Sequence, residues 1–463
     1  MLLSFLFYYR FFKIDIFTIR AFAFLSLTPN TINQQLFGSD FMSSLEALTE
    51  KAAQFVWGPA LLLLVLFGGA FFTVASGFYP LRKLRFIIKS TFGSLKGKSG
   101  GFAAMATALG ATAGTGNIVG VASAIAIGGA GAVFWMWVGA FLGMMLKFAE
   151  AAMAVKYRGG AMKYIERAFG GRKAAVAWCI CCIFASFGTG NMVQTNAAGN
   201  ICKSAFGVPP VFVGTAIALL SAAVLFRGAK AVIKVSSLFV PLMAAFYMLG
   251  CTALLFICRN NLSAAVKSIF SGAFAPLAMG GGIVGLITSK ALQIGIARGT
   301  FTNEAGMGSA SIAHAESGGT AAEQGCWGII EVFLDTMVCC TLTAFAILSS
   351  GLGNIDSTAS EAAFSKYFGG FGSAFLALSM FFFALAAVIG WAFYGEKALE
   401  YITKSKKSLL IYRLSFCACA AVGSVLSLPA VWNLSDIFNG LMIVPNMAAL
   451  LVLKKEIIKV SKQ

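Results

Sequence analysis

The chain has 463 residues, of which 59% are hydrophobic and only 11% are charged. Soluble domains usually carry about 25% charged residues, so this composition excludes a soluble domain and an enzyme of the aqueous phase. The formal net charge of +18 does not indicate nucleic-acid binding, because the basic residues form short clusters between apolar segments, where they set the orientation of a membrane protein.

Residues 1–56 form an N-terminal extension. Its apolar stretch at 2–27 contains four charged residues, a pattern that fits neither a signal peptide nor a spanning helix. An interfacial segment, or an upstream mis-start with Met42 as the true beginning, would each account for it. No function is assigned to residues 1–41.

Apolar segments of about 20 residues are long enough to cross a bilayer as helices. Eleven such segments follow, which predicts an all-α integral membrane protein with an extra N-terminal helix at 57–78. The remaining ten are 103–127, 132–155, 174–200, 209–226, 235–257, 280–297, 326–349, 371–395, 409–428 and 437–453.

The loops between these segments differ in charge. If alternate loops share one side of the membrane, one side holds 24 Lys and Arg residues and the other holds four. The positive-inside rule then places the C-terminal tail, 454–463, in the cytoplasm and the N-terminus outside. The ten later helices divide into two sets of five, 103–257 and 280–453. Because five is odd, the second set must be an inverted repeat of the first.

The first helix of each set contains glycine at matching places, in residues 116–121 (GNIVGV) and 281–286 (GGIVGL). Glycine-interrupted helices in two inverted halves indicate the central site of a transporter. Unwinding there frees backbone N–H and C=O groups, which a small zwitterion and a cation can bind. Close helix packing through small residues is the alternative interpretation.

Several polar side chains fall within or beside the predicted helices. Lys147 and Glu150 lie three residues apart on one helix face and are predicted to pair with each other. Asp335 is predicted to anchor a helix or to bind a cation. Lys290, inside the short seventh segment, needs a counter-ion or a wet cavity, and a cation fixed beside the site there would mimic Na⁺. His314 is predicted to be solvated.

Five passages carry a family likeness: 114–122, 134–150, 190–196, 298–309 and 389–396. Through them the chain resembles the alanine or glycine:cation symporter family, over most of its length from about residue 55. The resemblance implies the LeuT-like (APC-type) fold of two inverted five-helix repeats with one extra helix. It also implies sodium-coupled transport of small neutral amino acids, without a cofactor.

The resemblance further implies a set of site residues. The charged groups of the amino acid would meet the broken first core helix and a glutamine of the third, with an apolar wall opposite. These substrate contacts are Gly114, Thr115, Gly116, Asn117, Gln194, Ile283 and Trp391. The backbone carbonyls of Ala113 and Gly114 would bind Na⁺. The chain departs from the family at Ala386 and Ala387, near the positions where threonine hydroxyls usually help to bind Na⁺.

The sequence therefore predicts a secondary active symporter in the plasma (inner) membrane, not an enzyme. It would import alanine or glycine by alternating access, driven by a sodium gradient. Its expected partners are the amino acid, the coupling cation and the lipid bilayer, with no nucleic acid; the oligomeric state is not assigned. The alternatives are a carrier of the same fold that uses protons or exchanges amino acids, and a channel.

Overall fold

The computed structural model describes residues 39–94, 100–278, 285, 289–426 and 429–462. Within these residues the secondary structure is helical and contains no strand, as predicted. The helices before the first predicted repeat are α4 (Ser39–Val56), α5 (Pro59–Ala75), α6 (Tyr79–Arg82), α7 (Leu84–Thr91) and η1 (Phe92–Ser94).

The middle of the chain folds into long helices, two of which contain short π-helical segments. Its elements are α8 (Gly101–Thr112), η2 (Gly116–Gly120), α9 (Val121–Gly128), α10 (Gly131–Lys156), α11 (Ala161–Phe169), α12 (Arg172–Phe187), η3 (Gly188–Met192), α13 (Val193–Phe206), α14 (Pro210–Leu225), α15 (Ala229–Ile257), η4 (Arg259–Asn261) and α16 (Leu262–Ala278).

The C-terminal part repeats this pattern of long and interrupted helices. Its elements are α18 (Lys290–Asn303), α19 (Ser311–Ala315), α20 (Ala321–Val332), η5 (Phe333–Cys340), α21 (Thr341–Ser349), α22 (Ala359–Ile402), α23 (Lys406–Gly423), α24 (Pro429–Val452) and α25 (Lys454–Ser461).

Seven helices among the described residues are long and apolar enough to cross a membrane, and an eighth is formed if the bent pair α8 and α9 is one span. The extra N-terminal span begins earlier than predicted, because α4 and α5 form one apolar stretch over Glu46–Ala75. The predicted span 209–226 is the shorter apolar helix α14. The span 280–297 lies partly outside the described residues. The count of eleven and the inverted repeat remain predictions.

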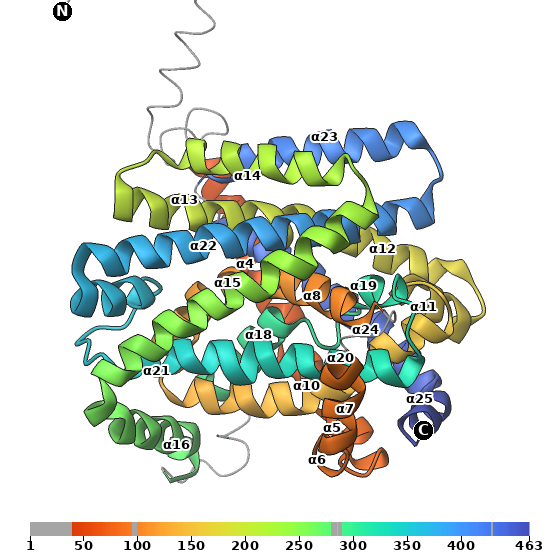
Figure 1. Ribbon diagram of the computed structural model, residues 1–463, viewed down its shortest axis with the longest axis horizontal. Helices are drawn as coiled ribbons and strands as arrows, with labels where there is room; N and C mark the ends of the chain where they lie inside the picture. Colours follow the sequence, from red (N-terminus) through yellow and green to blue (C-terminus); the bar gives the residue numbers. More distant parts are fainter. Residues whose placement is uncertain (1–38, 95–99, 279–284, 286–288, 427–428, 463) are drawn as a thin grey trace, which may run out of the picture.

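The long helix α22 lies across the middle of the bundle, where it packs against α12, α13 and α15 (Figure 1). On one side α14 and α23 pack together, and on the other α10 contacts both α18 and α20. The outer helices expose apolar side chains, including Leu238 (71%) and Leu249 (70%) of α15. Such a surface would be unstable in water and fits a lipid environment.

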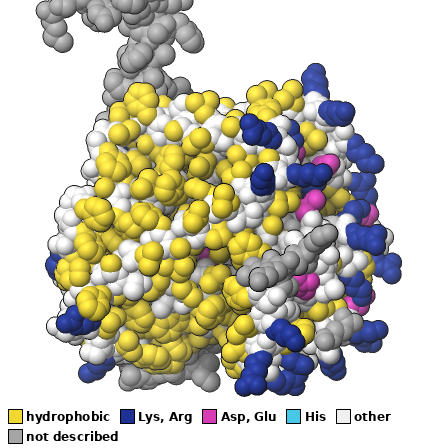
Figure 2. Space-filling model, viewed as in Figure 1, with side chains coloured by type: hydrophobic (Ala, Val, Ile, Leu, Met, Phe, Trp, Pro, Cys, Tyr) yellow, Lys and Arg dark blue, Asp and Glu magenta, His cyan; other side chains and the backbone are white. Residues whose placement is uncertain are grey.

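Basic side chains gather at one end of the molecule, whereas hydrophobic side chains cover the middle (Figure 2). The helices α7, α11 and α25, which the charge pattern assigns to the cytoplasmic side, lie toward this same end (Figure 1). Their positions agree with the predicted division of the loops.

Candidate functional site

The first broken helix runs from α8 to α9 and bends by 57°. α8 ends at Thr112, and Ala113 is extended (φ −69°, ψ 97°) before the chain resumes as η2. Gly114 follows, and a Cβ there would lie 2.6 Å from Oε1 of Gln194, so a larger residue would displace the end of that side chain. The helix is therefore interrupted at the glycine-rich residues that the sequence singled out.

The peptide groups freed by this break are bound by side-chain amides. Oε1 of Gln194 accepts a hydrogen bond from the N–H of Thr115 at 2.9 Å, and Oδ1 of Asn117 accepts one from the N–H of Gly114 at 3.1 Å. Gln194 also donates to the carbonyl of Thr189 at 3.0 Å. Oγ1 of Thr115 is buried and has no hydrogen-bond partner in the described part of the chain. A carboxylate is likewise an acceptor, so it could replace either amide oxygen at these N–H groups.

Trp391 provides an apolar surface beside η3. Its side chain is 1% exposed, and a Cβ on Gly190 would lie 2.2 Å from it. Gly190 precedes Gln194 by four residues, which places Trp391 about one helical turn from the glutamine along that helix. The structure thus brings Gly114, Thr115, Gly116, Asn117 and Gln194 together, with Trp391 nearby. Ile283 lies outside the described residues.

A second interruption separates α18 from α19, at residues 304–310. Glu304, Gly306 and Gly308 all have positive φ (55°, 94° and 82°), a conformation that favours glycine. Oε1 of Glu150 accepts from the N–H groups of Gly306 (2.8 Å) and Gly308 (3.1 Å), and also from Nδ2 of Asn446 (2.8 Å). The carboxylate of α10 therefore holds this segment in shape. The sequence had assigned it to a loop after residue 297, whereas the glycine break predicted at 281–286 lies almost entirely outside the described residues.

The predicted pairing of Lys147 with Glu150 is wrong. Nζ of Lys147 lies 3.1 Å from Oε1 of Glu331 on α20, and both side chains are buried. The prediction that His314 is solvated is also wrong, because it is fully buried, with Nδ1 2.8 Å from Gln324 and Nε2 3.3 Å from Glu331. Lys147 therefore pairs with a residue of another helix rather than with Glu150, and His314 bonds to buried side chains rather than to water. Helical spacing does not reveal either partner.

Lys290 does not lie beside the site. It is the exposed first residue of α18, which Ser289 caps by accepting from the N–H of Leu292. It lines an outer cavity of about 530 Å³ together with Arg298 and Asp436. The cavity agrees with the prediction that Lys290 needs a wet environment. Its exposed position at the start of α18 does not agree with the predicted role of a cation fixed beside the substrate site.

Asp335 is fully buried on η5 and faces the first break. Nδ2 of Asn117 donates to its Oδ1 at 2.7 Å, and Oγ1 of Thr336 donates to its Oδ2 at 2.9 Å. Thr336 also accepts from Nδ2 of Asn303 at 3.1 Å and lies 3.4 Å from Oγ1 of Thr302. The sequence showed Asp335 as a polar residue within a span, but not this cluster.

α22 presents methyl groups where it approaches the helix α8 that leads into the first break. Ala386 and Ala387 are buried, and a Cβ on Gly110 of α8 would lie 3.8 Å from the Cβ of Ala386. The carbonyl of Gly114 accepts from the N–H of Asn117 at 3.2 Å. The predicted Na⁺ ligands at Ala113 and Gly114 therefore gain no side-chain oxygen from these two alanines.

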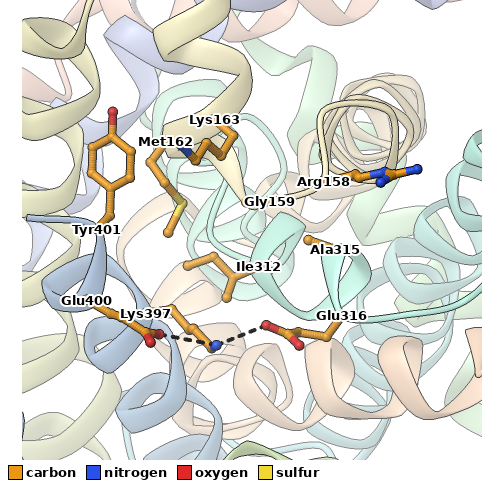
Figure 3. Close-up of a pocket in the computed structure, with 11 residues that line it drawn as sticks. Arg158, Gly159, Met162, Lys163, Ile312, Ala315, Glu316, Lys397, Glu400 and Tyr401 are labelled. Carbon is orange, nitrogen blue, oxygen red and sulfur yellow. Dashed lines mark ion pairs between the residues drawn. The ribbon is translucent and has the colours of Figure 1, made fainter. Parts of the chain in front are cut away.

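A cavity of about 370 Å³ opens at the basic end of the molecule, between the start of α11, α19 and the end of α22 (Figure 3). Nζ of Lys397 lies between two carboxylates, 3.1 Å from Glu316 and 3.3 Å from Glu400. Ile312 of α19 lines the same cavity. The short helix α19, which follows the second interruption, thus borders an opening that is lined by both basic and acidic side chains.

Comparison with known proteins decides the family. The model of the sodium:alanine symporter family matches residues 42–463. The chain belongs to this family. It is 38% identical to the sodium/alanine symporter AgcS of Methanococcus maripaludis, over 91% of this chain and 97% of that protein. It is 37% identical to the amino-acid carrier protein AlsT of Bacillus subtilis, over 91% and 92% of the two chains.

Solved structures also support the predicted type of fold for this family member. The crystal structure of MhsT in complex with L-phenylalanine matches with a TM-score of 0.56 and 14% identity, covering 78% of this chain and 96% of that one. At this identity the likeness concerns the fold alone. The chain is therefore a transporter-family membrane protein with the helical architecture of that amino-acid-bound structure.

Proposed function

We propose that this protein is a secondary active symporter that imports small neutral amino acids, alanine or glycine, with Na⁺. The observation that carries the proposal is the first break, where the N–H groups of Gly114 and Thr115 are held by neutral amide oxygens. An amino-acid carboxylate is a stronger acceptor than an amide oxygen, so it would displace them with a net gain. The unpartnered hydroxyl of Thr115 would supply a further donor.

The size of the substrate follows from the residues around this break. Gln194 fills the space beside Gly114, and Trp391 fills the space beside Gly190. Both side chains are buried, so little room remains for a substrate side chain. We infer that a methyl group or hydrogen fits and that larger side chains are rejected.

Two cavities would serve as the routes that alternating access requires. The cavity at Lys397 lies at the end of α22, whereas a second cavity of about 190 Å³ lies at its start and is lined by Ile118, Thr358 and Trp432. Asn117, Gln194 and Trp391 are buried from both. A closed site between two openings is the arrangement expected of a carrier, whereas an open pore would be expected of a channel.

The proposal is tested by uptake of labelled alanine into liposomes that contain the purified protein. Accumulation under an inward Na⁺ gradient, and none under an inward H⁺ gradient without Na⁺, is the expected result. Accumulation with an H⁺ gradient alone would show that the coupling ion is H⁺ rather than Na⁺. Counterflow without net accumulation would indicate an exchanger, and non-saturating flux would indicate a channel.

Replacing Trp391 with alanine is expected to admit larger amino acids. The variant should let unlabelled leucine compete with alanine uptake, because the wall beside Gly190 is removed. Burial of the indole also stabilises the fold by about 3–5 kcal/mol, so folded protein is first confirmed by size-exclusion chromatography. Trp391→Phe is the matched variant and should widen the range of accepted amino acids less than Trp391→Ala does. An unchanged substrate range in Trp391→Ala would remove this residue from the wall.

A further inference from the structure

Three buried polar residues link helix α24 to the first break. Asn439 of α24 is 0% exposed, and its Nδ2 donates to Oγ1 of Thr189 at 2.8 Å. The carbonyl of Thr189 accepts from Nε2 of Gln194 at 3.0 Å. Oε1 of the same glutamine accepts from the N–H of Thr115 at 2.9 Å. These bonds therefore run from α24 through η3 to a freed peptide group of the break.

The helix α24 packs directly against η3. A Cβ on Gly188, the first residue of η3, would overlap Oγ of Ser435, so glycine allows this close approach. Ser435 precedes Asn439 by four residues and shares a face of α24 with it. That face therefore meets two consecutive residues of η3, Gly188 and Thr189.

The π-helical geometry of η3 makes the carbonyl of Thr189 available to a side chain. The N–H of Val193 bonds to the carbonyl of Gly188, five residues earlier, whereas in a regular α-helix it would bond to Thr189. π-helical segments are rare, short and frequent at functional sites. The bond from Asn439 to the hydroxyl of Thr189 holds this segment from outside its own helix.

Stability alone does not explain an asparagine at position 439. Its Oδ1 is buried and has no hydrogen-bond partner within the part of the chain that the structure describes. A buried carbonyl oxygen without a partner costs more than one neutral hydrogen bond contributes. Leucine has the same number and branching of side-chain atoms and would avoid that cost. The amide therefore points to a role in the site to which it is bonded.

We propose that Asn439 is a positioning residue of the substrate site and fixes the orientation of the Gln194 amide through Thr189. This inference rests on the proposed function and deepens it, because Asn439 controls the affinity for the amino acid without touching it. Anchored at its hydroxyl, Thr189 keeps its carbonyl turned toward Nε2 of Gln194, so Oε1 is the end that faces Thr115.

This orientation suits a zwitterion. When the substrate carboxylate takes the N–H of Thr115, Oε1 of Gln194 loses its donor and is free to accept from the ammonium group. If the amide turned about its Cγ–Cδ bond, Nε2 would face the ammonium, and two donors would repel each other. Asn439 thus keeps the glutamine in the orientation that binds an amino acid.

The test compares folded, detergent-purified variants by alanine affinity and by hydrogen–deuterium exchange of residues 113–120 without substrate. Asn439→Leu should raise the alanine Kd by about tenfold, the equivalent of one hydrogen bond. Exchange at 113–120 should become faster, because the acceptor of the Thr115 N–H is no longer fixed. The melting temperature should stay close to that of the wild type, since leucine also removes the unpartnered oxygen.

Variants of Thr189 separate positioning from packing. Thr189→Val removes the hydroxyl and should raise Kd and exchange as Asn439→Leu does, so it tests the inference even if Asn439→Leu does not fold. Thr189→Ser keeps the hydroxyl and should keep wild-type affinity. The double variant of Asn439→Leu and Thr189→Val should bind alanine no more weakly than either single variant, because both changes break the same bond. Additive losses would overturn the inference.

Asn433→Leu is the matched control, because Asn433 is an asparagine of the same helix whose amide donates to Thr49 of α4 instead. It should match the wild type in both measurements. Unchanged exchange in folded Asn439→Leu would overturn the inference, as would wild-type alanine affinity in that variant. If exchange rises in Asn439→Leu but the wild type binds no alanine, the positioning role stands and the proposed substrate is wrong.

Discussion

Asn117→Ala is expected to raise the alanine concentration for half-maximal uptake by about 10- to 100-fold. This corresponds to the roughly 1.5–3 kcal/mol of a hydrogen bond to a charged group. The reason is that the Asn117 amide, which bonds to the N–H of Gly114 at 3.1 Å and to the carboxylate of Asp335 at 2.7 Å, is proposed to bond to the charged groups of the amino acid once the substrate carboxylate displaces it from Gly114. The substitution Asn117→Ala also leaves the carboxylate of Asp335 with one hydrogen-bond donor fewer.

Saturation of labelled alanine uptake in liposomes measures this effect directly. Asn261→Ala is the control, because Asn261 is an exposed residue whose amide donates to the carbonyl of Ser349, away from the site. Its half-saturation should match that of the wild type. Wild-type affinity in Asn117→Ala would remove Asn117 from substrate binding, whatever the variant does to the response to Na⁺.

The first break could be predicted because its signal is local. Consecutive small residues at 113–116 weaken a helix within one turn, and Asn117 and Gln194 are polar residues within predicted spans. The family resemblance then joined residues on separate helices, Gln194 and Trp391, which local patterns could not do. The structure shows Gln194 bonded to the break itself, at Thr115.

The second break was not recognised, because the same chemistry has another interpretation in sequence. Residues 302–311 are polar and glycine-rich, which is typical of a loop outside the membrane. What makes them part of the interior is Glu150, which lies 156 residues earlier and accepts from the N–H of Gly306. A contact over that distance leaves no periodic signal in a single sequence.

The charged residues of the interior were identified individually but paired wrongly. A spacing of three residues predicts contact between Lys147 and Glu150 on an isolated helix. In the folded protein α20 packs along α10 and brings Glu331 to the lysine. Glu150 is then free to bind backbone N–H groups. Helical spacing shows which residues share a face, but only tertiary packing decides which partner each one takes.

Lys147→Met is expected to lower the free energy of unfolding by about 3–5 kcal/mol, the cost of leaving one member of a buried ion pair alone. Both Lys147 and Glu331 are at most 1% exposed, and the pair is 3.1 Å apart. Glu331 would then lose its lysine partner inside the bundle and keep His314, whose Nε2 lies 3.3 Å away. Thermal or denaturant unfolding in detergent, followed by tryptophan fluorescence, measures the loss.

Two variants separate an unpaired charge from a simple loss of packing. Adding Glu331→Gln to Lys147→Met removes the isolated carboxylate while its amide keeps a partner for His314, so the double variant should regain most of the lost stability. Lys156→Met breaks the ion pair with Glu456 at the far end of the same helix α10, where the side chains are 39% and 36% exposed. Such a pair contributes about 0–1 kcal/mol, so this change should be nearly neutral. A double variant no more stable than Lys147→Met alone would show that the methylene packing of the lysine, rather than its charge, holds α10 against α20.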